Sequence, residues 1–122
     1  MHTGFFLAWL VDRDMVSGLI ADESADLISA LRSRRGRPGD LYAKWDGVLV
    51  PEMLNDEGNA FARAYYEQRF FDDYASLFPE ADAYKVRGTW KNYDRLAPLL
   101  DVRLAEWRAG IGRTPEGEAS GE

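Results

Sequence analysis

The stretch DEGNAFARAYYEQRFFDDYASLF, residues 56–78, is the longest periodic segment of the chain and decides its fold class. Its apolar residues recur at spacings of three and four, which is typical of a helix packed against a core. We expect the apolar face to consist of Phe61, Ala64, Tyr65, Phe71, Tyr74, Leu77 and Phe78. Asn55 or Asp56 is the expected N-cap, and Pro79 is expected to end the helix.

A second long helix is predicted over residues 90–109, WKNYDRLAPLLDVRLAEWRA. Thr89 is its expected N-cap and Gly110 its expected stop. Pro98 lies inside this stretch and lacks a backbone N–H, so it is expected to kink the helix or to split it in two.

Three shorter helices complete the prediction. Residues 3–13 are apolar nearly all round, which predicts a fully buried helix with Thr3 as its cap. Residues 22–34 and 38–46 are predicted to be helices as well, and Gly36 is expected to end the first of these. The predicted fold is therefore all-α.

The predicted architecture is an irregular bundle of four to five helices that forms one domain over residues 1–110. Minor extended segments are predicted near residues 48–50 and 83–87. Residues 111–122 are rich in Gly, Ser, Pro and Glu, and we expect them to form a disordered acidic tail.

The composition excludes several kinds of site. The 122 residues include no cysteine, which excludes disulfides, thiolate zinc sites and a cysteine nucleophile. The single histidine, His2, makes a histidine-based metal site unexpected. We expect no metal and no cofactor. The apolar run Phe5–Val11 is too short to span a membrane, so we expect a cytoplasmic protein without membrane association.

The net charge of −6 is unevenly placed along the chain. Residues 51–82 contain eight acidic and two basic residues, whereas residues 83–110 contain three acidic and six basic residues. An acidic segment disfavours nucleic-acid binding and would suit a basic protein partner. The arginines between residues 32 and 37 form a short basic run without interleaved aromatic residues, so they do not indicate a stacking surface for nucleic acid.

Aromatic residues make up 13% of the chain, and two adjacent pairs occur in the long helix. Neighbours on a helix point about 100° apart, so Tyr65 and Tyr66 cannot both face one core, and neither can Phe70 and Phe71. We expect one member of each pair to lie nearer the surface. Exposed aromatic rings beside acidic residues are typical of protein-recognition surfaces.

These features favour a protein-binding module, most concretely an immunity or inhibitor protein that neutralises a bacterial toxin or another enzyme. Its partner would be a protein, and no catalytic set is apparent. The expected contacts are Asp72, Asp73, Tyr74, Glu80 and Asp82. Carboxylates on such a surface would speed the encounter with a basic cleft.

The alternative is a small enzyme or ligand-binding domain with an aromatic-lined pocket. The polar and aromatic groups expected in that pocket are Asn59, Arg63, Trp90, Asn92 and Tyr93. Asn59 and Arg63 are four residues apart, so they could also form a simple hydrogen bond along one helix face.

Three stretches resemble a family of small bacterial proteins known only as a domain of unknown function. They are HTGFFLAWLV at residues 2–11, LNDEGNAFARAYYE at 54–67, and TWKNYDRLAPLLDVRLAEW at 89–107. The resemblance covers most of residues 2–110, and the last stretch is the most specific. Members of that family begin with an additional tryptophan- and glycine-bearing segment that this chain lacks. The resemblance implies no substrate, cofactor or catalytic residue.

Overall fold

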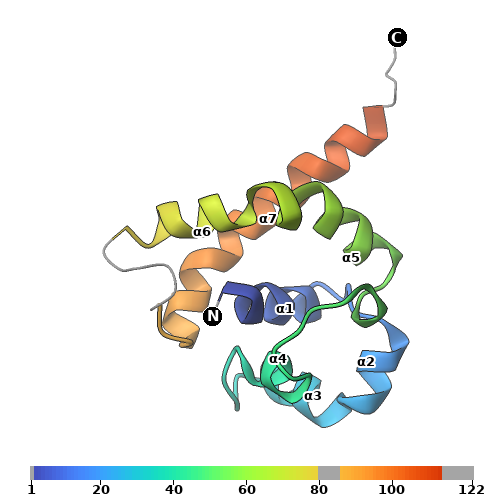
Figure 1. Cartoon of the computed structure of the whole chain (residues 1–122), viewed down its shortest axis with the longest axis vertical. Coiled ribbons are helices and arrows are strands. Elements are labelled where there is room, and N and C mark those ends of the chain that lie inside the picture. Colours follow the sequence, from blue (N-terminus) through green and yellow to red (C-terminus); the bar gives the residue numbers. More distant parts are fainter. Residues whose placement is uncertain (1, 80–85, 114–122) are drawn as a thin grey trace.

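The computed structural model describes residues 2–79 and 86–113, and this part of the chain forms an irregular all-α bundle, as the sequence predicts (Figure 1). No β-strand occurs in the described ranges, where one isolated bridge joins Val16 to Leu54. In chain order the helices are α1 (His2–Asp12), α2 (Gly18–Glu23), α3 (Ala25–Arg32), α4 (Asp40–Lys44), the 3-10 helix η1 (Pro51–Met53), α5 (Asp56–Phe61), the π-helix η2 (Ala62–Phe70), α6 (Phe71–Leu77) and α7 (Trp90–Arg113).

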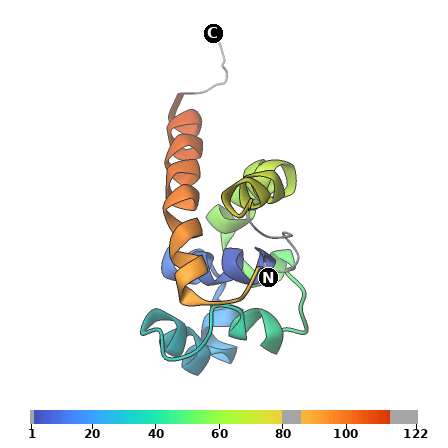
Figure 2. The same ribbon diagram turned by 90° about the vertical axis from the view of Figure 1, so that its left-hand side faces the viewer.

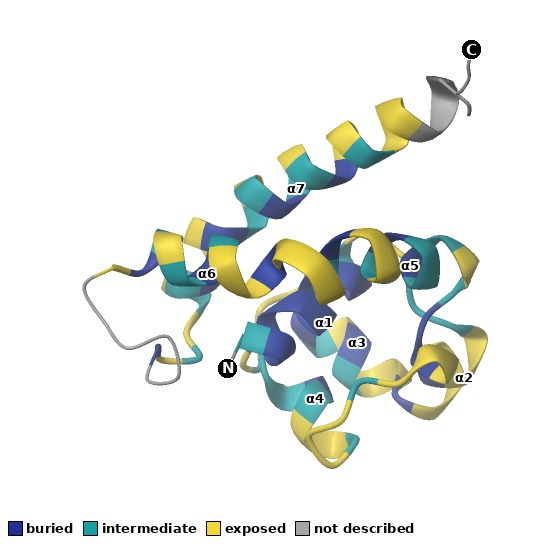
Figure 3. Ribbon diagram, turned by 45° about the horizontal axis from the view of Figure 1, so that its top comes forward, coloured by how far each residue is buried: buried dark blue, intermediate teal, exposed yellow. Residues whose placement is uncertain are grey.

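Helix α1 lies at the centre of the bundle, and every residue from Thr3 to Val11 is buried. Its near-uniform apolar character explains this position, because each face of the helix meets another element. Helices α3 and α4 pack on one side, and α7 crosses the other (Figures 1 and 3). The helix begins at His2, so Thr3 is inside it and is not the N-cap; its hydroxyl bonds to that of Tyr66.

The segment predicted as one helix over residues 22–34 is two helices that meet at Ser24. Helix α2 starts earlier than predicted because the side chain of Ser17 caps it by accepting a hydrogen bond from the Ile20 amide. Helix α3 ends at Arg32, before the expected stop at Gly36, and Arg34 adopts a left-handed conformation. The predicted helix at 38–46 forms the shorter α4.

The predicted helix over residues 56–78 is continuous but changes its winding in the middle. Helices α5 and α6 flank the π-helix η2, whose hydrogen bonds span five residues. Together α5, η2 and α6 form one helical rod, and the aromatic rings buried along it are Phe61, Tyr65, Phe70, Tyr74 and Phe78. The spacing of five residues between Tyr65 and Phe70 is one residue longer than the α-helical spacing of four. The π-helix accommodates this extra residue. Asn55 caps the rod, as predicted, by accepting a hydrogen bond from the Gly58 amide at 2.8 Å.

Each adjacent aromatic pair has one member nearer the surface, as predicted. Tyr65 is 3% exposed while Tyr66 is half-buried, and Phe70 is 1% exposed while Phe71 is 36% exposed. The predicted apolar face was wrong about Ala64 and Phe71, which are exposed, and it omitted Phe70. Phe70 is buried in place of Phe71 because of the π-helical winding, which an α-helical repeat does not predict.

Helix α7 is one unbroken element, with Pro98 inside it on an exposed position. Thr89 caps it, as predicted, by accepting a hydrogen bond from the Asn92 amide. The helix continues past Gly110 to Arg113, so the expected stop at Gly110 was wrong. Most of the second predicted extended segment and the rest of the predicted tail lie outside the described residues. Val50 does have an extended backbone, but residues 48–50 form no strand.

Candidate functional site

The acidic surface predicted from the sequence is not assembled as expected. Asp72 is exposed, but Tyr74 is fully buried among aromatic rings and cannot contact a partner. Asp73 faces the interior, where α7 packs. Glu80 and Asp82 lie outside the described residues. Of the three expected contacts that lie in the described residues, only Asp72 is exposed.

Asp73 is held by groups of the same domain. Its carboxylate accepts hydrogen bonds from Arg103 at 2.9 and 3.2 Å and from the Tyr65 hydroxyl at 2.7 Å. Burial alone would raise the pKa of Asp73, but the hydrogen bonds from Arg103 and Tyr65 outweigh it and hold the pKa below its usual value. Burial, together with the neighbouring Asp73 carboxylate, raises the pKa of Tyr65. This arrangement is a structural ion pair.

A second acidic residue of the middle segment is also paired with α7. Glu57 accepts two hydrogen bonds from Arg108, at 2.9 and 3.0 Å. The charge imbalance between residues 51–82 and 83–110 is therefore used in part to join α5 and α6 to α7. Less of it is available to an external partner than the sequence suggests.

A cleft of about 280 Å³ lies between the η1 region and the π-helix η2. Its walls are mostly apolar, with three polar side chains. The residues that line it are Leu49, Val50, Pro51, Leu54, Asn59, Ala62, Arg63, Tyr66 and Glu67. Two of the five residues expected in the alternative pocket, Asn59 and Arg63, thus lie in one cleft.

Asn59 and Arg63 have different roles in this cleft. The Asn59 amide donates to the backbone carbonyls of Pro51 and Leu54, at 2.9 and 3.2 Å, and thereby fixes the wall formed by residues 51–54. The predicted hydrogen bond between Asn59 and Arg63 does not form. Arg63 is exposed and makes no hydrogen bond or ion pair with the described residues, so its guanidinium is available to a ligand.

The rim of the cleft carries side chains that the sequence analysis did not single out. Val50 is 40% exposed, which is high for a large apolar side chain. Tyr66 is half-buried; burial raises its pKa, against the effect of its hydrogen bond with Thr3. The aliphatic run between Gly47 and Pro51 is the sequence signal for this rim, although its pattern alone predicts an extended segment or a buried connection.

The other residues of the alternative pocket lie elsewhere, so that pocket as a whole is not formed. The Trp90 indole donates to the Gly36 carbonyl at 2.6 Å. Asn92 donates to the Arg87 carbonyl at 2.9 Å. The Tyr93 hydroxyl is buried against the Asp12 carboxylate. All three join α7 to neighbouring segments.

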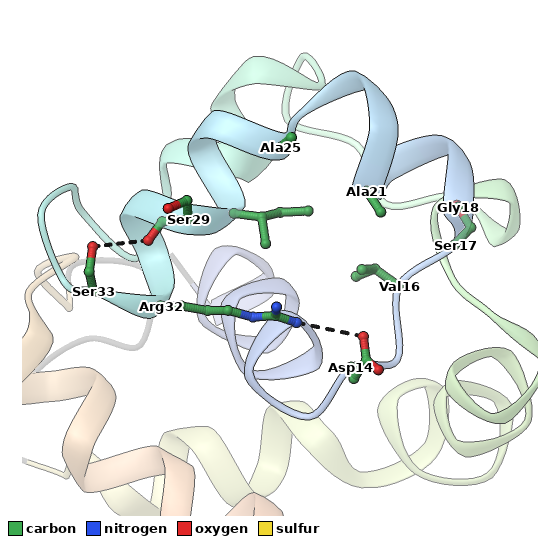
Figure 4. A pocket seen from close by; sticks show the side chains of 10 residues that line it. Asp14, Val16, Ser17, Gly18, Ala21, Ala25, Ser29, Arg32 and Ser33 are labelled. Atoms are coloured by element: carbon green, nitrogen blue, oxygen red, sulfur yellow. Dashed lines mark hydrogen bonds and ion pairs between the residues drawn. The ribbon is translucent and has the colours of Figure 1, made fainter.

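A larger and more open groove of about 620 Å³ lies between α2 and α3 (Figure 4). Val16 and Ile28 supply its largest apolar side chains, and Ala21 and Ala25 lie along one side. The Arg32 side chain runs along the opposite side toward Asp14, with 3.6 Å between the charged atoms. The groove offers an apolar surface with charges at its margin.

Neither a candidate metal site nor a membrane-crossing helix occurs in the described ranges. They contain no group of three or more histidine, cysteine or acidic residues that could hold a metal ion. None of the helices in these ranges has the length and apolar character that a membrane crossing requires.

Comparison with known proteins gives one result. A family described as Domain of unknown function (DUF7832) matches residues 1–86, which include α1 to α6. The third stretch of the resemblance, residues 89–107, lies outside the matched range. The chain matches no curated protein and no solved structure.

Proposed function

We propose that this chain, which belongs to the family described as Domain of unknown function (DUF7832), is a protein-binding module that uses the cleft between residues 49–54 and η2. The observation that carries the proposal is the grouping of an exposed valine, a half-buried tyrosine and an arginine that has no ion pair among the described residues around this cleft. Tyrosine and arginine are enriched among residues that dominate binding energy at protein interfaces.

The exposed apolar rim of the cleft favours a protein over a small molecule. Small-molecule pockets usually have volumes of roughly 300–1,000 Å³ and enclose most of the ligand. This cleft, at about 280 Å³, is close to the lower end of that range, and Val50 at its rim is exposed. A partner that inserts one side chain and covers Val50 would use both features.

The most concrete form of the proposal is an immunity or inhibitor protein that neutralises an enzyme. Glu67 lines the cleft, while Glu52 and Asp72 are exposed acidic residues of the same part of the chain. These carboxylates support a basic partner, because opposite charges increase the rate of encounter. Arg63 would then pair with an acidic group of the partner inside the cleft.

The test is to isolate the partner from the native host with the tagged full chain, and then to measure its affinity for defined variants. Arg63→Glu and Val50→Asp should each weaken binding at least tenfold, because one reverses the charge in the cleft and the other charges its apolar rim. Leu19→Asp is the matched control: Leu19 is 50% exposed but lies on α2, outside the cleft, and its variant should bind like the wild type.

Equal affinity of the wild type and the cleft variants would contradict the proposed surface. If the partner is an enzyme, its activity should fall as the wild-type chain is added and should be retained with Arg63→Glu. If an enzyme binds at the cleft and keeps its own activity, the inhibitor proposal is contradicted, and the proposal of a protein-binding module still stands.

A further inference from the structure

The cleft between residues 49–54 and η2 offers a ligand an apolar wall, a hydrogen-bond acceptor and two charges. The residues of the apolar wall are Leu49, Val50, Pro51, Leu54, Ala62 and Tyr66. The volume of about 280 Å³ is close to the smallest volume of a small-molecule pocket, roughly 300 Å³, so the cleft has room for one residue of a partner. The segment between α4 and α5, which forms one wall, lies on the opposite side of the bundle from α7 (Figure 2). Helix α7 therefore does not cover it.

The acceptor is the side-chain oxygen of Asn59. Both hydrogen bonds of this side chain are donated by its amide nitrogen, to the backbone carbonyls of Pro51 and Leu54. Because a carbonyl oxygen only accepts, these two bonds fix the orientation of the amide. The Oδ1 atom of Asn59 then has no donor among the described residues. A backbone N–H of a bound peptide would supply one.

Arg63 and Glu67 contribute one positive and one negative charge to the cleft. Both side chains are exposed, and four residues separate them along η2. They nevertheless form no ion pair with each other or with another described residue. Both charges are therefore available to a ligand that carries a carboxylate and a cationic group close together.

We propose that the cleft binds the C-terminus of the partner chain, with an apolar last residue that follows a basic one. This inference rests on the proposed function and names the acidic group that Arg63 binds. Arg63 binds the α-carboxylate, Asn59 accepts the N–H of the last residue, and the apolar side chain of that residue enters the cleft. Glu67 pairs with the basic side chain. A side-chain carboxylate would instead bring a charge against the apolar wall, which is unfavourable.

The test is a titration of the isotope-labelled full chain with short peptides, followed through its backbone amide signals by NMR. The probe is acetyl-Gly-Gly-Lys-Leu with a free C-terminus, which should shift the signals of residues around the cleft. The same peptide with a C-terminal amide should bind about tenfold more weakly, because it loses the charge-assisted hydrogen bonds to Arg63. Acetyl-Gly-Gly-Glu-Leu with a free C-terminus should also bind more weakly, because its glutamate meets Glu67.

Variants of the chain assign each preference to one residue. Arg63→Gln should bind the acid and the amide peptides equally, and Glu67→Gln should lose the preference for lysine over glutamate. Arg69→Gln is the matched control, because Arg69 is another exposed arginine of η2 that lies outside the cleft. This variant should bind all three peptides like the wild type, and the dispersion of the amide signals checks that each variant is folded.

Three outcomes would overturn the inference. They are equal binding of acid and amide peptides by the wild type, a preference for the acid that Arg63→Gln retains, and an acid peptide that shifts no signal around the cleft. The proposed function fails by a different result, an isolated partner that binds Val50→Asp and Arg63→Glu as tightly as the wild type. If those two variants weaken the partner but removal of its last residue does not, the proposed function stands and the C-terminal mode of binding is wrong.

Discussion

The guanidinium of Arg103 on α7 donates to both carboxylate oxygens of Asp73 on α6, at 2.9 and 3.2 Å. The Tyr65 hydroxyl, from the π-helix, donates to the same carboxylate at 2.7 Å. The side chains of Arg103 and Asp73 are only 22% and 17% exposed, so water screens the pair weakly. One carboxylate therefore joins η2, α6 and α7.

Replacing Arg103 with alanine should lower the free energy of unfolding by about 1.5–3 kcal/mol, which is typical of hydrogen bonds to charged groups. The loss arises because Asp73 remains largely buried without its cation. Urea unfolding measures it. The matched control is Arg108→Ala, which removes the more exposed pair with Glu57, whose side chains are 51% and 41% exposed. That change should cost about 0–1 kcal/mol. Equal losses for the two variants would contradict the structural role of the Asp73 pair.

Stability should depend on pH through the carboxylates whose pKa is lowered in the fold, which are Glu57, Asp73 and Asp101. In Asp73 and Asp101, burial acts to raise the pKa, but hydrogen bonds from Arg103 and Tyr65 in one case, and from Arg13 and Trp9 in the other, hold the pKa below its usual value. The unfolded chain then binds protons more readily than the folded one. Their stabilisation is fully present well above the unfolded value of about 3.9 and is lost as pH falls through the lower folded values.

Urea unfolding between pH 7 and pH 3 checks this dependence. The free energy of unfolding should decrease as pH falls below about 5, and the decrease should be smaller in Asp73→Asn, which has one titrating carboxylate fewer. A variant with the same pH dependence as the wild type would show that Asp73 is not one of the groups responsible.

The sequence predicted the helical class, the all-round burial of α1 and the caps Asn55 and Thr89, because these follow from local periodicity and side-chain chemistry. It did not predict the π-helix, since an α-helical repeat was assumed over residues 56–78. The signal was present in the aromatic residues themselves. Successive steps from Phe61 through Tyr65, Phe70 and Tyr74 are four, five and four, and the step of five does not fit one face of an α-helix.

The site was predictable only where its residues are close in sequence. Asn59 and Arg63 line one cleft because one helical rod presents both. Trp90 and Tyr93 were expected in the same pocket, but α7 packs so that they meet Gly36 and Asp12. Counting charges by segment also missed that arginines of α7 neutralise acidic residues of α5 and α6. Tertiary packing decides where Trp90 and Tyr93 lie and which charges are neutralised. It cannot be predicted by considering each segment of the sequence separately.

Tyr74 should tolerate loss of its hydroxyl. The ring is fully buried, and its hydroxyl has no hydrogen-bond partner among the described residues. Burial raises the pKa of Tyr74 to about 12, so the group is neutral at physiological pH. A buried polar group without a partner costs about 1–3 kcal/mol, so Tyr74→Phe should leave the free energy of unfolding unchanged or raise it by up to about that amount.

The comparison for Tyr74→Phe is Tyr65→Phe, which removes a hydroxyl of similar burial that does have a partner, Asp73. This change should lower the free energy of unfolding by about 1–3 kcal/mol, because a mostly buried carboxylate loses a donor. Thermal or urea unfolding of both variants checks the contrast. A destabilised Tyr74→Phe variant would show that its hydroxyl is hydrogen-bonded in solution.

Two glycines should respond to alanine in opposite directions. At Gly58, at the start of α5, an added Cβ would lie 2.4 Å from the backbone carbonyl oxygen of Met15. The same oxygen accepts a hydrogen bond from the backbone N–H of Asn55 at 3.1 Å. Backbone atoms cannot move aside as a flexible side chain can, so Gly58→Ala should lower the free energy of unfolding by about 1–3 kcal/mol. Gly110 lies in α7 with open space around it, and Gly110→Ala should raise stability by roughly 0.5–1 kcal/mol through helix propensity. Urea unfolding measures both changes, and a harmless Gly58→Ala would contradict the close approach of α5 to the segment at Met15.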